Sequence, residues 1–158
     1  MSQPEKIFMR EAIRLAEEGM NSDSGGPFGA VVVKNGEIIA RGFNRVTSDN
    51  DPTAHAEVIA IREACKKLGT FQLDDCEIYT SCEPCPMCLG AIYWARPRKV
   101  YYACTREDAA AANFDDQFIY DELELKIDER KVSFENMIRD EGRHVFQKWM
   151  LKADKTEY

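Results

Sequence analysis

The chain has 158 residues, of which 44% are hydrophobic and 31% are charged, the balance of a globular protein with one domain over residues 1–158. Its 28 acidic and 21 basic residues give a net charge of -7. This charge argues against a long nucleic acid as the main ligand, because phosphate binding usually leaves a basic surface. We also expect no membrane partner and a cytoplasmic protein, since neither a long apolar run nor a signal-peptide pattern is present.

The first half of the sequence predicts a helix followed by a hairpin. Residues 2–5 form a capping-box pattern. A core-facing apolar stripe follows at helical spacing: Phe8, Ala12, Leu15, Ala16 and Met20. An Asn-Gly pair at residues 35–36, between the apolar runs 30–33 and 37–40, is a strong hairpin signal. A polar loop is expected over residues 47–51.

The second half predicts alternating helices and strands. We expect a helix over residues 53–68, a strand over 77–80, a helix over 87–95 and a strand over 99–103. This alternation predicts an α/β layer fold with a mixed sheet. After Thr105 the pattern is weaker. We expect a short helix over 109–112 and a charged, solvated segment over 121–131. The tail that follows carries enough apolar side chains to pack against another surface.

A histidine, a glutamate and a cysteine pair carry the chemistry of the sequence. His55-Ala56-Glu57 is followed about thirty residues later by Pro84-Cys85-Pro86-Met87-Cys88. The order H-x-E and then P-C-x-x-C is the signature of zinc-dependent deaminases. His55, Cys85 and Cys88 would hold one Zn²⁺, and three protein ligands leave the fourth position open for water. The cysteine pair opens a predicted helix, where the helix dipole favours thiolates.

Glu57 is the predicted catalytic residue. It lies two residues from His55, so its carboxylate points in a neighbouring direction, beside the activated water. Zinc lowers the pKa of such a water to about 7. Glu57 would take the proton and pass it to the substrate, a role that typically contributes about 10²–10⁴-fold in rate.

A structural zinc site is the competing interpretation. Cys82, Cys85 and Cys88 are evenly spaced, and together with His55 they could close a Cys₃His site without catalytic function. The spacing alone does not decide between the two sites. Three of the six cysteines crowd this one loop, which favours metal chemistry in a reducing compartment over a disulfide framework.

Beyond the zinc motif, the chain resembles the cytidine deaminase-like superfamily, and within it the bacterial guanine deaminases, over nearly its whole length. The zinc motif is common to the superfamily, whereas Phe114-Asp115-Asp116 and the C-terminal Glu157-Tyr158 indicate the guanine branch. The segments that carry the resemblance are residues 25–30, 51–57, 79–88, 90–95, 114–116 and 157–158.

This resemblance implies a three-layer α/β/α cytidine deaminase-like fold with a central mixed sheet of about five strands. It also implies a homodimer with one Zn²⁺ per subunit, in which C-terminal segments of about residues 106–158 are exchanged. The exchange would place Asp116 and Tyr158 of one subunit over the zinc of the other.

The resemblance further implies contacts to a small purine substrate. Asn44 would hydrogen-bond the purine, Phe28 and Trp94 would flank its ring, and the Ala56 backbone N–H would meet the position attacked. Asp116 would accept from ring N–H groups, and Glu141 is a second carboxylate considered for the site. From composition alone, Phe28 and Trp94 fit a core equally well, and Asp116 could cap a helix.

The implied function is hydrolytic deamination of guanine to xanthine and ammonia, a step of guanine catabolism. Guanosine, another aminated heterocycle or tRNA adenosine are alternative substrates for the same zinc chemistry. A non-enzymatic zinc-binding module with Cys82 as the fourth ligand is the alternative from a different class.

Overall fold

The computed structural model describes residues 5–158, and the chain divides into two compact units. The N-terminal unit ends at Asp116, and the C-terminal unit covers Gln117–Tyr158. Residues 2–4 of the predicted capping box lie outside the described residues. Helix α1 spans Lys6–Asn21 and buries the predicted stripe up to Ala16, but Met20 is exposed.

Four strands form the sheet of the N-terminal unit, in the order β2-β1-β3-β4. β1 pairs antiparallel with β2 and β3, whereas β3 and β4 are parallel, so the sheet is mixed as predicted. The predicted hairpin is confirmed: Asn35 and Gly36 both have positive φ, as a two-residue turn between twisted strands requires. The bounds are β1 Gly29–Lys34, β2 Glu37–Phe43, β3 Cys76–Cys82 and β4 Lys99–Cys104.

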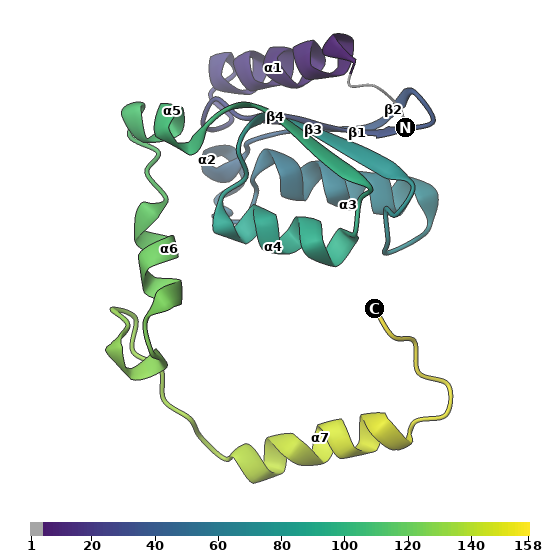
Figure 1. The fold of residues 1–158 in the computed structure, drawn as a ribbon, viewed down its shortest axis with the longest axis vertical. Helices are drawn as coiled ribbons and strands as arrows, with labels where there is room; N and C mark the ends of the chain where they lie inside the picture. Colours follow the sequence, from purple (N-terminus) through teal and green to yellow (C-terminus); the bar gives the residue numbers. More distant parts are fainter. Residues whose placement is uncertain (1–4) are drawn as a thin grey trace. The chain divides into compact units, whose positions relative to one another are not determined.

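Helices cover both faces of the sheet, which confirms the three-layer architecture. Helix α1 packs on one face, and helices α3 (Ala56–Leu68) and α4 (Pro86–Ala95) lie on the other (Figure 1). The sheet has four strands where about five were expected. The described chain after β4 is helical or irregular, because its alanine-rich and charged segments lack the alternating apolar pattern of a strand.

The start of α3 differs from the prediction in a way that matters for His55. The Asp51 carboxylate accepts hydrogen bonds from the Thr53 backbone N–H and hydroxyl, at 2.8 and 2.7 Å. This local turn competes with helix, so α3 begins at Ala56 instead of residue 53 and His55 is its N-cap. The predicted polar loop before it contains the short helix α2, Val46–Asp49.

The remaining helices bury none of their residues. Helix α5, Arg106–Ala111, belongs to the N-terminal unit and begins three residues before the helix predicted there. The C-terminal unit contains α6 (Gln117–Glu124), the 3₁₀ helix η1 (Ile127–Glu129) and α7 (Arg139–Leu151), and none of its residues is buried.

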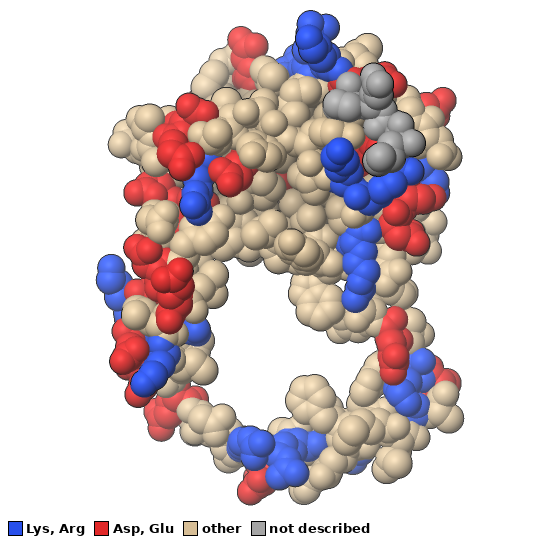
Figure 2. Space-filling model, viewed as in Figure 1, with Lys and Arg blue, Asp and Glu red and all other residues tan. Residues whose placement is uncertain are grey.

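The described residues contain no helix that is both long and apolar enough to cross a membrane. On the face drawn in Figure 2, the side chains of Lys and Arg are interspersed with those of Asp and Glu.

A close backbone approach fixes the N-terminal end of α3. A Cβ on Gly42 of β2 would lie 2.5 Å from the Ala56 carbonyl oxygen and 2.9 Å from the Ala60 nitrogen. Neither atom can move without displacing the helix. Glycine at position 42 therefore allows α3 to lie directly on the sheet, with His55 and Glu57 at its start.

We predict that Gly42→Ala moves this helix end. Overpacking of this kind typically costs about 1–3 kcal/mol, so the free energy of unfolding should fall by roughly that amount. Zinc content should fall with it, because His55 moves. Chemical denaturation and metal analysis measure both effects. Glu37→Ala, at an exposed position of the same strand, is the matched control. Unchanged stability and zinc content in Gly42→Ala would contradict the role given to this contact.

Candidate metal centre

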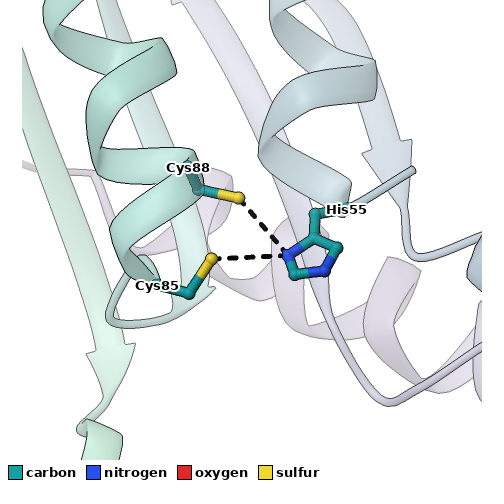
Figure 3. Close-up of side chains that lie close together, drawn as sticks. All are labelled: His55, Cys85 and Cys88. Atoms are coloured by element: carbon teal, nitrogen blue, oxygen red, sulfur yellow. Dashed lines mark hydrogen bonds between the residues drawn. The ribbon is translucent and has the colours of Figure 1, made fainter. Parts of the chain in front are cut away.

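Two helix starts bring the three predicted metal ligands together. His55 is the N-cap of α3, Cys85 is the N-cap of α4, and Cys88 lies in the first turn of α4. Figure 3 shows the imidazole of His55 facing both cysteine side chains. Their ligand atoms all lie within 4.8 Å of one another, which confirms the clustering expected from the spacing. Pro86 suits the first position of α4, where no backbone N–H is needed.

The separations of these atoms fit a tetrahedral zinc ion. His55 Nδ1 lies 3.6 Å from Cys85 Sγ and 3.4 Å from Cys88 Sγ. With Zn–S bonds of about 2.3 Å and Zn–N bonds of about 2.1 Å, tetrahedral geometry separates a nitrogen and a sulfur ligand by about 3.6 Å. The three residues therefore fit Zn²⁺ with little rearrangement, and they leave one coordination position to a non-protein group.

The hydrogen bonds among the ligands favour the thiolate form of one of the two cysteines, which is the form that binds a metal. Hydrogen bonds from the Cys88 thiol and then from His55 lower the pKa of Cys85 to about 4. The hydrogen bond with Cys85, followed by burial, raises the pKa of Cys88. The hydrogen bond between His55 and Cys85 raises the pKa of His55. One thiolate is thus present near neutral pH, and a metal would displace the remaining protons.

Glu57 lies beside the ligands but outside the group of three. Its side chain is buried, with 6% of the residue exposed, and its Oε1 accepts a hydrogen bond of 3.1 Å from the Thr80 hydroxyl. Burial raises the pKa of Glu57, and a hydrogen bond with Cys88 partly opposes this shift. A buried carboxyl with a raised pKa, next to a metal position, is suited to take up and release a proton.

Cys82 does not join the metal group found among the described residues. It is the last residue of β3, and its Sγ lies 3.5 Å from the Thr105 carbonyl oxygen. Burial raises the pKa of Cys82 to about 12. The geometry therefore favours the open site of three ligands over the closed Cys₃His site.

The side chain of Asn44 is held in one orientation. Its Oδ1 accepts hydrogen bonds from the backbone N–H groups of Gly26, at 3.3 Å, and Val46, at 3.1 Å. The amide NH₂ is then the part that can donate to a ligand. A Cβ on Gly25 would lie 2.1 Å from the Asn44 Oδ1, so glycine is required for this arrangement.

The Phe-Asp-Asp segment packs against the loop before β1. The rings of Phe28 and Phe114 meet edge to face, with centroids 5.1 Å apart. Two residues later, burial and then the negative charge of Cys85 raise the pKa of Asp116. Asp116 therefore approaches Cys85 of its own chain. The expectation that Asp116 reaches the metal of the partner subunit, within an exchanged segment of about residues 106–158, stays a prediction.

The remaining residues predicted to contact the substrate are Ala56, Trp94, Glu141 and Tyr158. Ala56 is the first residue of α3, where a backbone N–H has no acceptor within the helix. Trp94 is 62% exposed and lies six residues after Cys88, about 9 Å further along the axis of α4 and on a different face. Glu141 and Tyr158 belong to the C-terminal unit, and their roles stay predictions.

Two contributions were missed from the sequence. Thr80 was assigned only to a strand, yet its hydroxyl holds Glu57. The signal was the alternation along β3, which turns Thr80 to the same face as Ile78, the face covered by α3. Phe114 was used only as part of a motif, and its contact with Phe28 spans a sequence separation that no local pattern reveals.

The fold and the ligand set together define a class of protein. A His-Cys-Cys metal group with a buried carboxyl beside it, at two helix starts on one side of a mixed α/β/α sheet, is the arrangement of zinc-dependent deaminases. The family profile described as "Cytidine and deoxycytidylate deaminase zinc-binding region" matches residues 2–104. The chain belongs to this deaminase family.

Two groups of relatives, guanine deaminases and tRNA-specific adenosine deaminases, match different shares of the chain. The guanine deaminase of Bacillus subtilis is 60% identical over 97% of this chain and 98% of its own. The crystal structure of guanine deaminase from that organism superposes with a TM-score of 0.95 over 99% of both chains, at 58% identity. The tRNA-specific adenosine deaminase of Aquifex aeolicus is 46% identical over 62% of this chain and 62% of its own.

We predict that single cysteine substitutions separate the open site from the closed one. Cys82→Ser should retain one zinc per chain, because Cys82 Sγ lies against the Thr105 carbonyl oxygen. Cys85→Ser should lose most of its zinc, because two protein ligands remain. Metal analysis of proteins purified in parallel measures the difference. Loss of zinc from Cys82→Ser with retention in the wild-type protein would restore the Cys₃His interpretation.

Proposed function

We propose that this protein hydrolyses guanine to xanthine and ammonia. The observation that carries the proposal is the likeness to the Bacillus subtilis guanine deaminase, which extends through the C-terminal unit. The likeness to the Aquifex aeolicus tRNA-specific adenosine deaminase covers 98 residues. The segment beyond the shared deaminase region therefore favours guanine as the substrate and a place in guanine catabolism.

His55, Cys85 and Cys88 would hold the zinc ion. Their donor atoms suit this metal in chemistry and in separation. When bound, zinc acts as a Lewis acid that makes a water molecule nucleophilic near neutral pH. The helix starts that carry the ligands add positive ends of helix dipoles, which favour the negative charge gathered at this site.

Glu57 would move the protons of the reaction. Addition of water to C2 of guanine requires removal of a proton from the water and protonation of N3. Release of ammonia then requires a second proton on the 2-amino group. The buried carboxyl of Glu57, with its raised pKa, can accept the first proton and deliver it in turn. Thr80 would keep the carboxyl oriented through its hydroxyl.

Asn44 and Asp116 would select the purine. The held amide of Asn44 offers hydrogen-bond donors, which suit an acceptor such as the purine carbonyl oxygen. An ionised Asp116 offers only acceptors, which suit the ring N–H groups of guanine. Adenine has an acceptor on its Watson–Crick edge where guanine has the N1 donor, so it would meet Asp116 with two acceptors facing each other. Phe28, packed on Phe114, would supply an apolar wall for the ring.

The substrate panel tests this proposal. We expect ammonia release from guanine by the zinc-loaded protein, and at least 100-fold less from guanosine, adenine, cytosine, ammeline and tRNA. Glu57→Gln should retain zinc while losing roughly 10²–10⁴-fold in turnover, because the proton carrier is lost. Turnover of another substrate but not guanine would keep the zinc chemistry and reject the substrate. Near-normal turnover by Glu57→Gln would reject the role of Glu57.

We also propose a homodimer with exchanged C-terminal segments. The sequence led to an expected segment of about residues 106–158, and the boundary between the two compact units supports an exchanged part of residues 117–158. The C-terminal unit has no buried residue, although apolar side chains are frequent in it. Such a segment needs another surface to cover it. Helix α7 exposes five of these side chains: Val145, Phe146, Trp149, Met150 and Leu151. Helix α4 offers exposed apolar side chains as well: Leu89, Tyr93 and Trp94.

In this dimer, Tyr158 of one subunit would close the metal centre of the other, with Glu141 and Trp94 at the same interface. We also propose a cytoplasmic location, supported by the six free cysteines, which suit a reducing compartment. The absence of a long nucleic acid among the partners stays a prediction from the net charge.

We predict that two inactive variants complement each other. Cys85→Ser lacks zinc but keeps the tail, whereas a Tyr158 deletion keeps zinc and lacks the proposed lid. Co-expressed chains should regain roughly a quarter of wild-type activity, since random pairing makes half the dimers mixed, with one complete site each. Light scattering should give twice the 18.1 kDa chain mass. Full activity of the Tyr158 deletion, or no recovery on mixing, would contradict the exchange.

A further inference from the structure

Glu83 joins the metal-binding loop to the start of α5. It lies directly before Pro84, between the end of β3 and the cysteine pair, and it is half-buried. Its backbone N–H donates to the Cys104 carbonyl oxygen at 2.8 Å. Its carboxylate Oε2 accepts from the Arg106 backbone N–H, also at 2.8 Å. Both bonds connect the loop of Cys85 to the turn where β4 passes into α5.

Helix α5 depends on contacts of this kind for its position. It has six residues, too few for a helix to be stable by itself in water. Its first turn has orphan N–H groups, and those of Arg106 and Asp108 find side-chain acceptors. Glu83 accepts from Arg106, and the Thr105 hydroxyl accepts from Asp108 within a capping box. Of these acceptors, the Glu83 carboxylate is the one that comes from outside the helix and its cap.

The far end of α5 leads directly to the proposed purine contacts. Asn113 adopts a left-handed conformation, and the Phe114 N–H donates to the Ala109 carbonyl oxygen at 2.9 Å, which closes the helix end. Phe114 then packs on Phe28, and Asp116 follows two residues later. A shift of α5 would therefore displace Asp116 relative to Cys85.

We propose that Glu83 is a positioning residue that sets the distance between the metal-binding loop and Asp116, by anchoring the first turn of α5 to the loop that carries Cys85. This inference rests on the proposed function, because it assigns Asp116 to substrate recognition. Glu83 itself touches neither the metal ligands nor the substrate in this scheme. It acts through the backbone of Arg106.

The test compares three substitutions of Glu83. Glu83→Ala removes the acceptor, and Glu83→Asp keeps the charge but is one methylene too short. Both should raise KM for guanine roughly tenfold, the usual scale for losing a charged hydrogen bond, with a smaller change in kcat. Glu83→Gln retains an acceptor oxygen and should stay within about threefold of wild type. Zinc content should not change, and the exposed Glu63→Ala on α3 is the charge-matched control.

A double-mutant cycle with Asp116→Asn separates positioning from general stability. If Glu83 acts through Asp116, Glu83→Ala should change KM by less than about twofold in the Asp116→Asn background. Additive effects, loss of zinc, or an unchanged KM in Glu83→Ala would overturn the proposal. Where Glu83→Ala does not fold, the cycle is measured with Glu83→Asp. Absence of guanine turnover by the wild-type protein would instead reject the proposed function, so the two failures are distinct.

Discussion

The site depends on holding two helix starts within the bonding distance of one metal ion. Three ligand atoms lie within 4.8 Å of one another, yet His55 and the cysteine pair come from segments about thirty residues apart. The fully buried strand β3 leads into the cysteine loop, and the backbone contact at Gly42 fixes the start of α3. Because both helices begin at this point, their dipoles favour thiolates and a carboxylate there. The geometry and the electrostatics of the centre therefore have a common origin in the packing of α3 and α4.

Burial together with charge repulsion is the second constraint on this site. Cys85, Cys88, Glu57 and Asp116 can all carry negative charge within a small volume. For both Glu57 and Asp116, burial is the main cause of the raised pKa, and the charge of Cys85 adds to it. A bound divalent cation would offset the charge of the thiolates and make the ionised forms of the carboxyls more favourable. Metal binding and proton release are consequently coupled, and the carboxyls surrounding the zinc ligands are part of that coupling.

Features encoded by short spacings could be predicted from the sequence, and features set by distant contacts could not. The Asn35-Gly36 hairpin and the Cys85/Cys88 pair follow from two-residue and three-residue spacings. The start of α3 was placed too early, because an Asp51 side-chain turn competes with the helix. The contact of Phe114 with Phe28 joins segments more than eighty residues apart, so no local pattern could predict it.

The orientation of Asn44 has a consequence for the form of ligand that the proposed purine contact would accept. Its carbonyl oxygen is occupied by two backbone N–H groups, so the amide cannot rotate to exchange donor for acceptor without losing both bonds. A purine in its lactam tautomer presents an acceptor oxygen to this NH₂. The lactim tautomer presents a hydroxyl whose proton competes for the same space. If Asn44 binds the purine as proposed, the bonds that hold its amide would make binding sensitive to the position of a single proton on the ligand.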